Sequence, residues 1–389
     1  MLILVINAGS SSMKFQLMDS GKNFTTLVKG IVDRLGQEEQ IYSDNKGHKE
    51  TTKIESYSEA LDYILKHFIK HNVIKSFQDI KAVGHRVVHG GEAYKKPTVI
   101  TPKVLKTITE LSSLAPLHNP PNIEGIKACK KVLPTIPQVA VFDTSFHQTM
   151  PEKAFLYALP LELYKKHNIR RYGFHGTSHT YVLQQALKIL NKKNAKVITC
   201  HLGNGCSVTA TRNGKSVDTS MGFTPLEGLM MGTRCGDLDP ALPLALIKTL
   251  KTTPEKIDQL LNRESGLKGI SGKYSDMRDI WATCKKDSKS KLAMEIYCYR
   301  IAKYIGAYAA ALNGVDAIAF TAGIGENAWY VRKMVCDYLT FLGLALDKKK
   351  NLLNKPLITT PKSKVKVLVI PTNEEKEIAQ ETAKLLKNK

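Results

Sequence analysis

The same local pattern occurs twice in this chain, once in each half. In residues 2–19 an apolar run of strand length leads into a polar turn, Asn7-Ala-Gly-Ser-Ser-Ser12, and then into a hairpin. In residues 196–219 a second apolar run leads into Gly203-Asn-Gly-Cys-Ser207 and a hairpin closed by Asn213-Gly214, a dipeptide typical of type I′ turns. The repeat predicts a duplicated α/β domain, with the cleft between the two copies as the default ligand site.

Elsewhere in the chain, apolar runs of strand length alternate with helical patterns, which is typical of an α/β protein. Further strands are expected at residues 80–84, 138–142, 317–321 and 365–370. Helices are expected after the N-capping residues Ser56, Thr101, Thr253 and Thr372, over 291–312 and over 326–342. The first domain is expected to cover residues 1–150, completed by a C-terminal helix at 374–389, and the second residues 151–373.

Composition and charge indicate a globular protein and argue against a nucleic-acid binder. The chain has 389 residues, of which 43% are hydrophobic and 24% charged, so it can bury a large core. Its formal net charge is +22, but the basic residues are spread along the chain. A nucleic-acid binder usually clusters them on one face or tail, so nucleic acid is not expected as a partner. A solvated, Lys-rich surface is expected instead, whose field also attracts anionic substrates.

Cysteine usage and hydropathy indicate the compartment. The seven cysteines are odd in number and form no C-x-x-C pair, which fits reduced thiols better than a disulfide framework. The apolar start, Met1–Ile6, is too short for a signal-peptide core and has no basic segment before it. The most apolar longer stretch, 305–325, is interrupted by Asn313, Gly314 and Asp316. We therefore expect a cytoplasmic protein without a membrane partner.

Three glycine-rich or serine-rich turns follow predicted strands. Asn7–Lys14 and His201–Gly205 offer backbone and hydroxyl donors to phosphate, although neither is a Walker A sequence and both are compatible with ordinary turns. Ala322–Asn327 joins a strand to a helix, and a glycine turn at a helix N-terminus suits a nucleotide. Together these turns predict polyphosphate binding.

Isolated charged residues accompany these turns. Arg86 and Asp143 each lie close to the end of a buried strand, where α/β proteins place ligands. Asp143 could bind Mg²⁺, position a substrate, act as a base or cap a helix. His175 and Arg234 lie in glycine-rich loops. No zinc-type spacing and no G-x-S-x-G motif is present, and the set suits phosphoryl transfer, in which catalysis is mostly positioning and charge neutralisation.

The motifs as a set resemble those of the acetate kinase family, within the acetate and sugar kinase/heat-shock 70/actin superfamily. The resemblance runs the whole chain and is carried by Val83-Gly-His-Arg-Val-Val-His-Gly-Gly91, Phe142-Asp-Thr, Tyr172-Gly-Phe-His-Gly-Thr-Ser-His179, His201-Leu-Gly-Asn-Gly205, Gly232-Thr-Arg-Cys-Gly-Asp-Leu-Asp-Pro240, Gly323-Ile-Gly-Glu-Asn327 and Pro371-Thr-Asn-Glu-Glu375. It implies two actin-like (ribonuclease H-like) domains and a homodimer. It also implies direct in-line transfer, ATP + acetate ⇌ ADP + acetyl phosphate, with Mg²⁺ as cofactor and Mn²⁺ as an alternative ion.

The resemblance also implies roles for individual residues. At the reaction centre, Arg86 and Arg234 would flank the acyl phosphate, Asp143 would be the essential carboxylate and His175 would support the transition state. The metal would be held by Asn7 and Glu374. The phosphates would be held by Ser10, Ser12, Lys14, His201, Leu202, Gly203, Asn204 and Gly205. The nucleoside would be held by Asp276, Met277, Arg278, Gly323, Ile324, Gly325, Glu326 and Asn327. The methyl group of acetate would lie against Val88, Leu117, Phe174 and Pro225.

The chemistry of the acid agrees with these roles and leaves alternatives open. Acetate is already ionised at neutral pH and needs no general base, so Asp143 is better interpreted as orienting a metal or an arginine than as accepting a proton. A propionate or butyrate kinase is the nearest alternative. A sugar or glycerol kinase would need a polar pocket, and pyrophosphate could replace ATP as donor. An actin-like filament, a chaperone ATPase or a nucleic-acid binder would not need the two arginines.

Overall fold

The computed structural model describes residues 1–387 and divides into two compact units. Unit 1 contains residues 1–146 together with the C-terminal segment that begins at Asn373, and unit 2 contains His147–Thr372. The division that the sequence predicts at residue 150 therefore falls at Phe146 in the structure.

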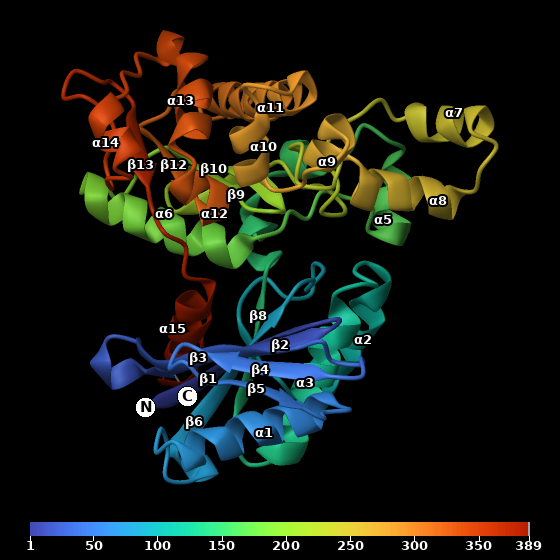
Figure 1. Cartoon of the computed structure of the whole chain (residues 1–389), viewed down its shortest axis with the longest axis vertical. Coiled ribbons are helices and arrows are strands. Elements are labelled where there is room, and N and C mark those ends of the chain that lie inside the picture. The colour runs from blue at the N-terminus through green and yellow to red at the C-terminus, as the bar shows by residue number, and fades with distance from the viewer. Residues whose placement is uncertain (388–389) are drawn as a thin grey trace. The chain divides into compact units, whose positions relative to one another are not determined.

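Unit 1 is built on one eight-stranded mixed sheet in the order β5-β4-β3-β2-β1-β6-β8-β7 (Figure 1). The strands are β1 (Leu2–Gly9), β2 (Ser12–Asp19), β3 (Thr25–Asp33), β4 (Gln40–Asp44), β5 (Lys49–Thr52), β6 (Ile80–Val87), β7 (Thr98–Val99) and β8 (Gln138–Phe142). The helices are α1 (Tyr57–Lys70), α2 (Pro102–Glu110), α3 (Asn119–Val132) and α15 (Glu374–Lys387). Strands β1 to β5 form antiparallel neighbours, whereas β1, β6 and β8 run parallel.

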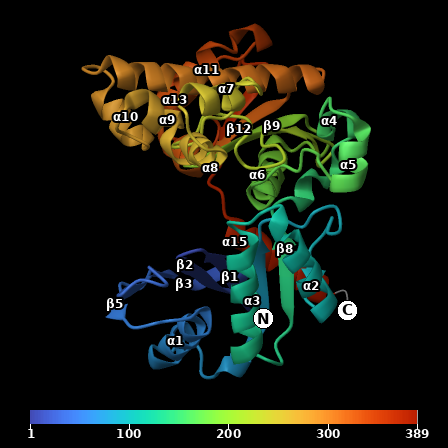
Figure 2. The ribbon, with the colours of Figure 1, turned by 90° about the vertical axis from the view of Figure 1, so that its right-hand side faces the viewer.

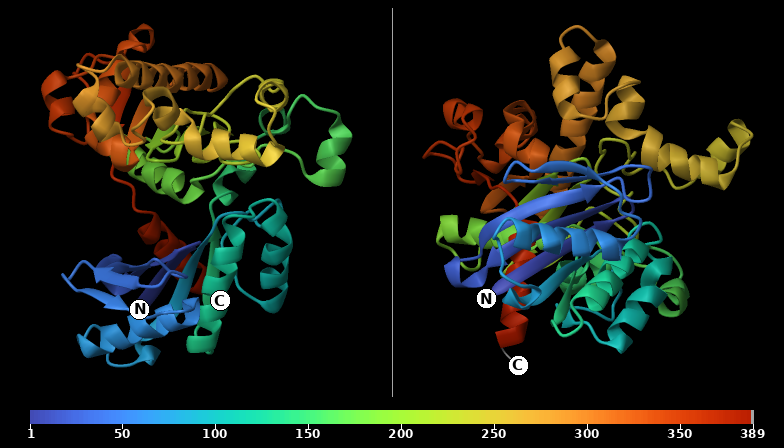
Figure 3. Two further views of the ribbon diagram at one scale, coloured as in Figure 1. Left: turned by 45° about the vertical axis from the view of Figure 1, so that its right-hand side comes forward. Right: turned by 60° about the horizontal axis from the view of Figure 1, so that its bottom comes forward.

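Helices cover both faces of this sheet because side chains alternate along its strands. Leu4 and Ile6 of β1 pack into a core with α1 and α3, whereas Ile3 and Val5 pack into a second core with α15. Helices α1 and α3 accordingly lie on one face of the sheet and α15 on the other (Figures 2 and 3). Helix α15 approaches β6 closely at Gly84, where an added Cβ would lie 2.6 Å from Thr382 Oγ1 and 2.8 Å from the Ile378 side chain. The last helix of the chain is thus an integral part of the first unit.

Unit 2 is built on a five-stranded sheet in the order β11-β10-β9-β12-β13. The strands are β9 (Val197–Leu202), β10 (Cys206–Arg212), β11 (Lys215–Thr219), β12 (Ala317–Thr321) and β13 (Lys366–Val369). The helices are α4 (Glu152–Phe155), α5 (Leu161–His167), α6 (Gly176–Leu190), α7 (Leu242–Thr249), α8 (Pro254–Gln259), α9 (Gly266–Ser271), α10 (Met277–Thr283), α11 (Ser288–Ala311), α12 (Ala322–Asn327), α13 (Trp329–Asp337) and α14 (Lys348–Leu352).

The strand orders confirm the predicted repeat. In each unit a central strand, β1 or β9, has an antiparallel hairpin on one side and two parallel strands on the other. The hairpin between β10 and β11 turns at Asn213 and Gly214, whose φ values of 54° and 75° are those of the expected type I′ turn. The two units are the two copies of a duplicated actin-like fold.

One long helix expected over residues 326–342 is broken in the structure. Helices α12 and α13 are separated at Ala328 (φ −88°, ψ 78°), and a short 3₁₀ turn, Thr340–Leu342, ends before Gly343. The carbonyls of Gly325 and Glu326 accept hydrogen bonds from the side chain of Arg332. Because a side chain satisfies these carbonyls, the backbone has no need to continue the helix through Ala328.

Two helix starts and one turn also differ from expectation. Asn373, not Thr372, caps α15: its Oδ1 accepts from Lys376 N at 2.9 Å, while the Thr372 hydroxyl bonds to Ser178 at 2.8 Å. Helix α11 begins at Ser288, three residues early, because Asp287 caps it. Strand β1 continues to Gly9, so the first polar turn is only Ser10-Ser11. Within residues 1–387, no helix is long and apolar enough to cross a membrane.

Candidate active site

The carboxyl ends of β1, β6 and β8 meet at one edge of the unit 1 sheet because these strands are parallel neighbours. Asn7 lies near the end of β1, Arg86 near the end of β6, and Asp143 directly after β8. Ligands of open α/β sheets bind at this kind of edge. The topology therefore collects three of the predicted site residues that are far apart in the sequence.

Arg86 and Asp143 form a partly buried ion pair at this edge. Arg86 Nε and Nη2 both donate to Asp143 Oδ2, at 3.0 and 2.6 Å, and the Asp143 side chain is only 1% exposed. Glu374, the first residue of α15, lies with Oε2 3.8 Å from Arg86 Nε. Burial acts against the charged guanidinium, but the carboxylates of Asp143 and Glu374 overcome it and raise the pKa of Arg86 above its ordinary value. The arginine is permanently charged, with two carboxylates beside it.

The other predicted residues of unit 1 are more dispersed. Ser10 and Lys14 are exposed, and Ser12 is half-buried at the start of β2. Val88 is buried directly after β6, where its backbone N donates to Asn122 Oδ1 at 3.0 Å. Leu117, expected in the same methyl pocket, is 64% exposed. Of these residues, Val88 is the one that the structure places in packed surroundings next to Arg86.

In unit 2, the side chains of His175 and Arg234 both lie against the phosphate-type turn. A Cβ added to Gly205 would lie 3.5 Å from Arg234 Nη1 and 3.5 Å from His175 Nε2, so both side chains border this glycine. The His175 ring also stacks on His201, with centroids 4.1 Å apart. His175 takes a left-handed backbone conformation, φ 57°, at the N-cap of α6. A guanidinium and two imidazoles thus surround a backbone turn that can accept phosphate.

Arg234 differs from Arg86 in its partners. It donates to the carbonyl oxygen of Pro225 at 3.2 Å and lies 3.7 Å from Met231 Sδ. Among the described residues no carboxylate pairs with it, and burial lowers the pKa of Arg234 below its ordinary value. A half-buried cation with only neutral partners is suited to meet an incoming anion.

A chain of hydrogen bonds orients His175 from behind. Its Nδ1 lies 2.9 Å from Ser207 Oγ, and the same hydroxyl lies 2.7 Å from His179 Nε2. His179 Nδ1 in turn bonds to Thr199 Oγ1 at 2.7 Å, and burial lowers the pKa of His179 well below its ordinary value. The neutral His179 and Ser207 therefore fix the orientation of the His175 ring. Neither position has a distinctive signal in the sequence, because their roles depend on how α6 packs against the paired strands β9 and β10.

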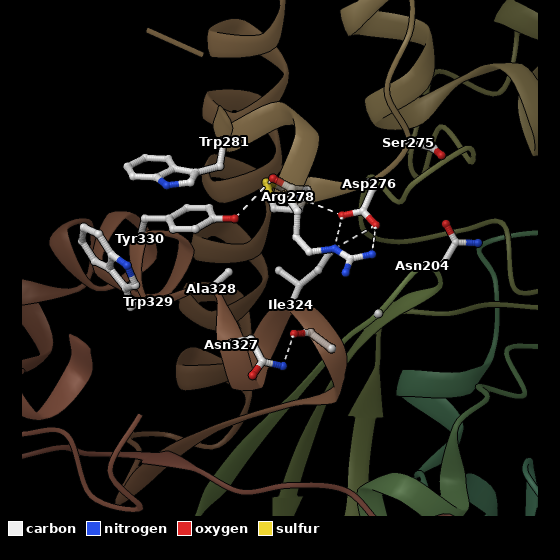
Figure 4. Close-up of a pocket in the computed structure, with 13 residues that line it drawn as sticks. Asn204, Ser275, Asp276, Arg278, Trp281, Ile324, Asn327, Ala328, Trp329 and Tyr330 are labelled. Atoms are coloured by element: carbon white, nitrogen blue, oxygen red, sulfur yellow. Dashed lines mark hydrogen bonds and ion pairs between the residues drawn. The ribbon is translucent and has the colours of Figure 1, made fainter. Parts of the chain in front are cut away.

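A cavity of about 870 Å³ opens beside the same turn, wholly within unit 2 (Figure 4). Three segments that are distant in sequence line it: the turn after β9, the start of α10, and the region from α12 to α13. Its lining residues are Gly203, Asn204, Ser275, Asp276, Met277, Arg278, Trp281, Gly323, Ile324, Asn327, Ala328, Trp329 and Tyr330. The volume lies within the range of small-molecule and cofactor pockets.

Comparison with known proteins shows the family of the chain. The sequence profile of the Acetokinase family matches residues 2–380. This chain belongs to the acetokinase family. It is 55% identical over 399 residues to the acetate kinase of Thermotoga maritima, with 99% of each chain covered. Among solved structures, it is similar to the Porphyromonas gingivalis acetate kinase (TM-score 0.95, 44% identity, 99% of each chain). It is also similar to a propionate kinase from Francisella tularensis (TM-score 0.92, 46% identity, 98% of this chain and 99% of that one).

Most of the nucleoside positions taken from the acetokinase resemblance line the cavity, but two do not. Gly325 is a buried residue of α12, and its carbonyl oxygen accepts from Arg332. The carboxylate of Glu326 accepts from the backbone N of Ala322 at 2.8 Å and of Thr372 at 3.1 Å. Both residues belong to α12, which begins directly after β12, so the segment predicted as a glycine turn is itself helical. Leu202, fully buried in β9, can offer only its backbone to a phosphate.

Aromatic residues of the cavity were missed at the sequence level. Trp281 stacks on Tyr330 with centroids 4.0 Å apart and planes 6° apart, and Trp329 meets Trp281 edge-on at 5.6 Å (Figure 4). The sequence did contain an indication of these aromatic residues, because the chain has only two tryptophans and each closely follows a predicted nucleoside segment. Flat aromatic faces of this kind suit a nucleobase.

Proposed function

We propose that this member of the acetokinase family transfers a phosphoryl group between ATP and acetate, forming ADP and acetyl phosphate in a reversible reaction. The observation that carries the nucleotide part is the cavity of about 870 Å³ that adjoins the turn at Gly203-Asn204. Relatives named acetate kinase match the chain over nearly its whole length, which supports acetate as the acceptor.

The nucleoside of ATP is proposed to occupy the cavity, with its phosphates toward His201–Gly205. Gly203 and Asn204 line both the cavity and the turn, so one ligand can occupy both. The Asp276–Arg278 pair, with Arg278 Nη2 2.7 Å from Asp276 Oδ2, presents a carboxylate and a guanidinium for polar groups of the nucleoside. Ser10, Ser12 and Lys14 are proposed to contact phosphate from unit 1.

The acceptor needs charge neutralisation rather than a base. Because acetate is ionised at neutral pH, its approach to a phosphate is opposed by like charge. We assign Arg86 to the carboxylate of the acid and Arg234 with His175 to the negative charge of the transferred group. Asp143 holds Arg86 through two hydrogen bonds to one oxygen, so its proposed role is to orient the guanidinium. Phe174 and Pro225 are proposed to contact the methyl group of acetate.

The donor set at the edge of unit 1 fits Mg²⁺. Asn7, Asp143 and Glu374 offer amide and carboxylate oxygens, the ligands that this hard ion prefers. We propose that Asn7 and Glu374 hold the ion, with Mn²⁺ as an alternative, and that Asp143 stays with Arg86. The bound ion would supply neutralisation of phosphate charge. We further propose, on the family resemblance, a cytoplasmic homodimer.

The proposal is tested by direct assay. Purified protein with Mg-ATP and acetate is expected to form acetyl phosphate, trapped by hydroxylamine as the hydroxamate, and EDTA is expected to abolish the product. Propionate, butyrate and glycerol are assayed in parallel, and pyrophosphate is tried in place of ATP. Phosphorylation of glycerol without phosphorylation of acetate would contradict the assignment.

Val88 is expected to limit the size of the acid. If it bounds the methyl pocket, Val88→Ala makes room for one more carbon and improves kcat/KM for propionate relative to acetate. An extra buried methylene is worth about 0.8 kcal/mol, or roughly fourfold. The kinetic ratio is measured together with the melting temperature. Val87→Ala is the matched control, because Val87 is fully buried in the core of Phe142 and Ile108 and is expected to lower stability without changing the ratio. An unchanged ratio in Val88→Ala would place Val88 in the core alone.

A further inference from the structure

Three histidines of unit 1 converge where α1 packs against the β4–β5 hairpin. His67 lies in the last turn of α1 and His71 caps its end, so the two are neighbours on one helix face. His48 comes from the turn between β4 and β5. One ring nitrogen of each histidine lies within 4.8 Å of the others, and the ring centroids are 3.9–4.8 Å apart. Within residues 1–387 this is the one such group of histidine, cysteine or carboxylate ligands.

Two of these nitrogens lack any hydrogen-bond partner. His67 Nε2 and His71 Nε2 are both shielded from solvent and make no hydrogen bond, although His67 Nε2 lies 3.5 Å from Asp44 Oδ2. A buried polar atom without a partner is costly, so such a pair facing a third imidazole calls for a ligand. The three imidazole rings together can coordinate one metal ion, which a lone histidine cannot do.

Asp44 supplies the orienting group that metal-binding histidines usually have. Its side chain is 1% exposed and accepts from Tyr42 Oη at 2.9 Å. His48 Nδ1 lies 2.9 and 3.1 Å from the two carboxylate oxygens of Asp44. Because this bond occupies Nδ1, Nε2 is the ring nitrogen of His48 that remains available to a metal, as in carboxylate–histidine–metal arrangements.

We propose that His48, His67 and His71 bind one borderline divalent transition-metal ion, of which Zn²⁺ is the representative, with Asp44 orienting His48. Three imidazole nitrogens select Zn²⁺, Ni²⁺, Co²⁺ or Cu²⁺ over Mg²⁺, which prefers oxygen. At Zn–N distances of about 2.0–2.1 Å the ligand nitrogens, which lie within 4.8 Å of one another, must move closer together around the ion. None of these residues belongs to the proposed reaction, so the ion would join the hairpin to α1 rather than take part in phosphoryl transfer.

The test titrates ZnCl₂ into EDTA-treated, dialysed full-length protein by calorimetry. His71→Gln and His48→Gln are expected to lose one Zn²⁺ site that the wild type retains, while Asp44→Asn is expected to weaken the site by on the order of 10–100-fold. His167→Gln is the matched control, because His167 is exposed on α5 and outside the group. Excess Mg²⁺ is expected not to displace the ion.

Two further measurements distinguish the loss of metal binding in a variant from a general loss of its stability. Zn²⁺ is expected to raise the melting temperature of the wild type and of His167→Gln but not of His71→Gln, because only a protein that binds the ion when folded is stabilised by it. Co²⁺ in place of Zn²⁺ is expected to give visible d–d absorption that His48→Gln and His71→Gln lack. Equal Zn²⁺ stoichiometry and affinity in the wild type and both variants, or no Zn²⁺ binding by the wild type, would overturn the proposal.

Discussion

Arg234→Ala is expected to lower kcat by on the order of 10²–10³, with little change in melting temperature. The magnitude is the usual one for removal of a preorganised charge donor from a reaction centre. The stability of the fold is spared because Arg234 donates only to the Pro225 carbonyl and contacts Met231, so no buried carboxylate loses its partner. Steady-state kinetics in the acetyl phosphate-forming direction, together with a thermal melt, measure both effects.

Two further variants test whether the effect is specific to the guanidinium of Arg234. Arg234→Lys is expected to recover little activity, because a point charge does not replace the planar guanidinium. Arg212→Ala is the matched control, since Arg212 is exposed at the end of β10 and is expected to leave kcat unchanged. Full activity of Arg234→Lys would remove Arg234 from the reaction centre.

Arg86→Ala is expected to behave differently from Arg234→Ala. It should lose kcat by a similar factor but also destabilise the fold by about 3–5 kcal/mol, because the buried charge of Asp143 would lose both hydrogen bonds from Arg86. The contrast between the two arginines therefore tests the structure as well as the mechanism.

Arg332→Met is expected to destabilise the protein by at least about 3 kcal/mol and to lower the melting temperature by on the order of 10 °C. Arg332 is fully buried. It donates to the carbonyls of Gly325 and Glu326, and to Asn351 and Asn354. Burial lowers the pKa of Arg332 to about 10, so it remains charged at neutral pH and is solvated by these neutral oxygens. Methionine would fill the space but leave the acceptors unsatisfied.

The neighbouring lysine provides the control for Arg332. Lys333→Met removes a partly exposed ion pair with Asp337, 2.6 Å between Nζ and Oδ2, on the same helix. Such a pair contributes about 0.3–0.5 kcal/mol, so a nearly unchanged melting temperature is expected. Equal melting temperatures for Arg332→Met and Lys333→Met would show that the buried guanidinium network does not support α12.

The elements predicted best are those whose signal is local. Strands β8 and β12 begin and end at the predicted residues because each is a run of five buried residues in which apolar side chains predominate. Arg86 and Asp143 were predicted for a related reason, since a charged residue at the end of a buried strand is conspicuous in the sequence. Local pattern and tertiary environment agree at these places.

What the sequence missed depends on particular side-chain contacts that a local pattern does not specify. The break at Ala328 depends on the side chain of Arg332 and on Asn351, whose Nδ2 donates to the Trp329 carbonyl. Helix α15 is capped by Asn373. The hydroxyl of Thr372 instead forms a hydrogen bond with Ser178, which lies near the start of unit 2 in the sequence, whereas Thr372 lies at its end. His48 and His67 come together only through the packing of a hairpin on a helix. Periodicity carries no information about such contacts.

Because α15 belongs to unit 1, the order of translation determines which of the two units can finish folding first. Ile3, Val5, Val139 and Val141 of the sheet need Ile378, Ala379 and Ala383 to complete their core, and Glu374 to bring a second carboxylate to Arg86. All of unit 2 is translated between β8 and α15, so at roughly 5–20 residues per second this apolar sheet face waits on the order of tens of seconds. The unit that begins the chain is therefore the last to finish folding. A nascent chain arrested before Asn373 would expose that sheet face to chaperones while unit 2 is already complete.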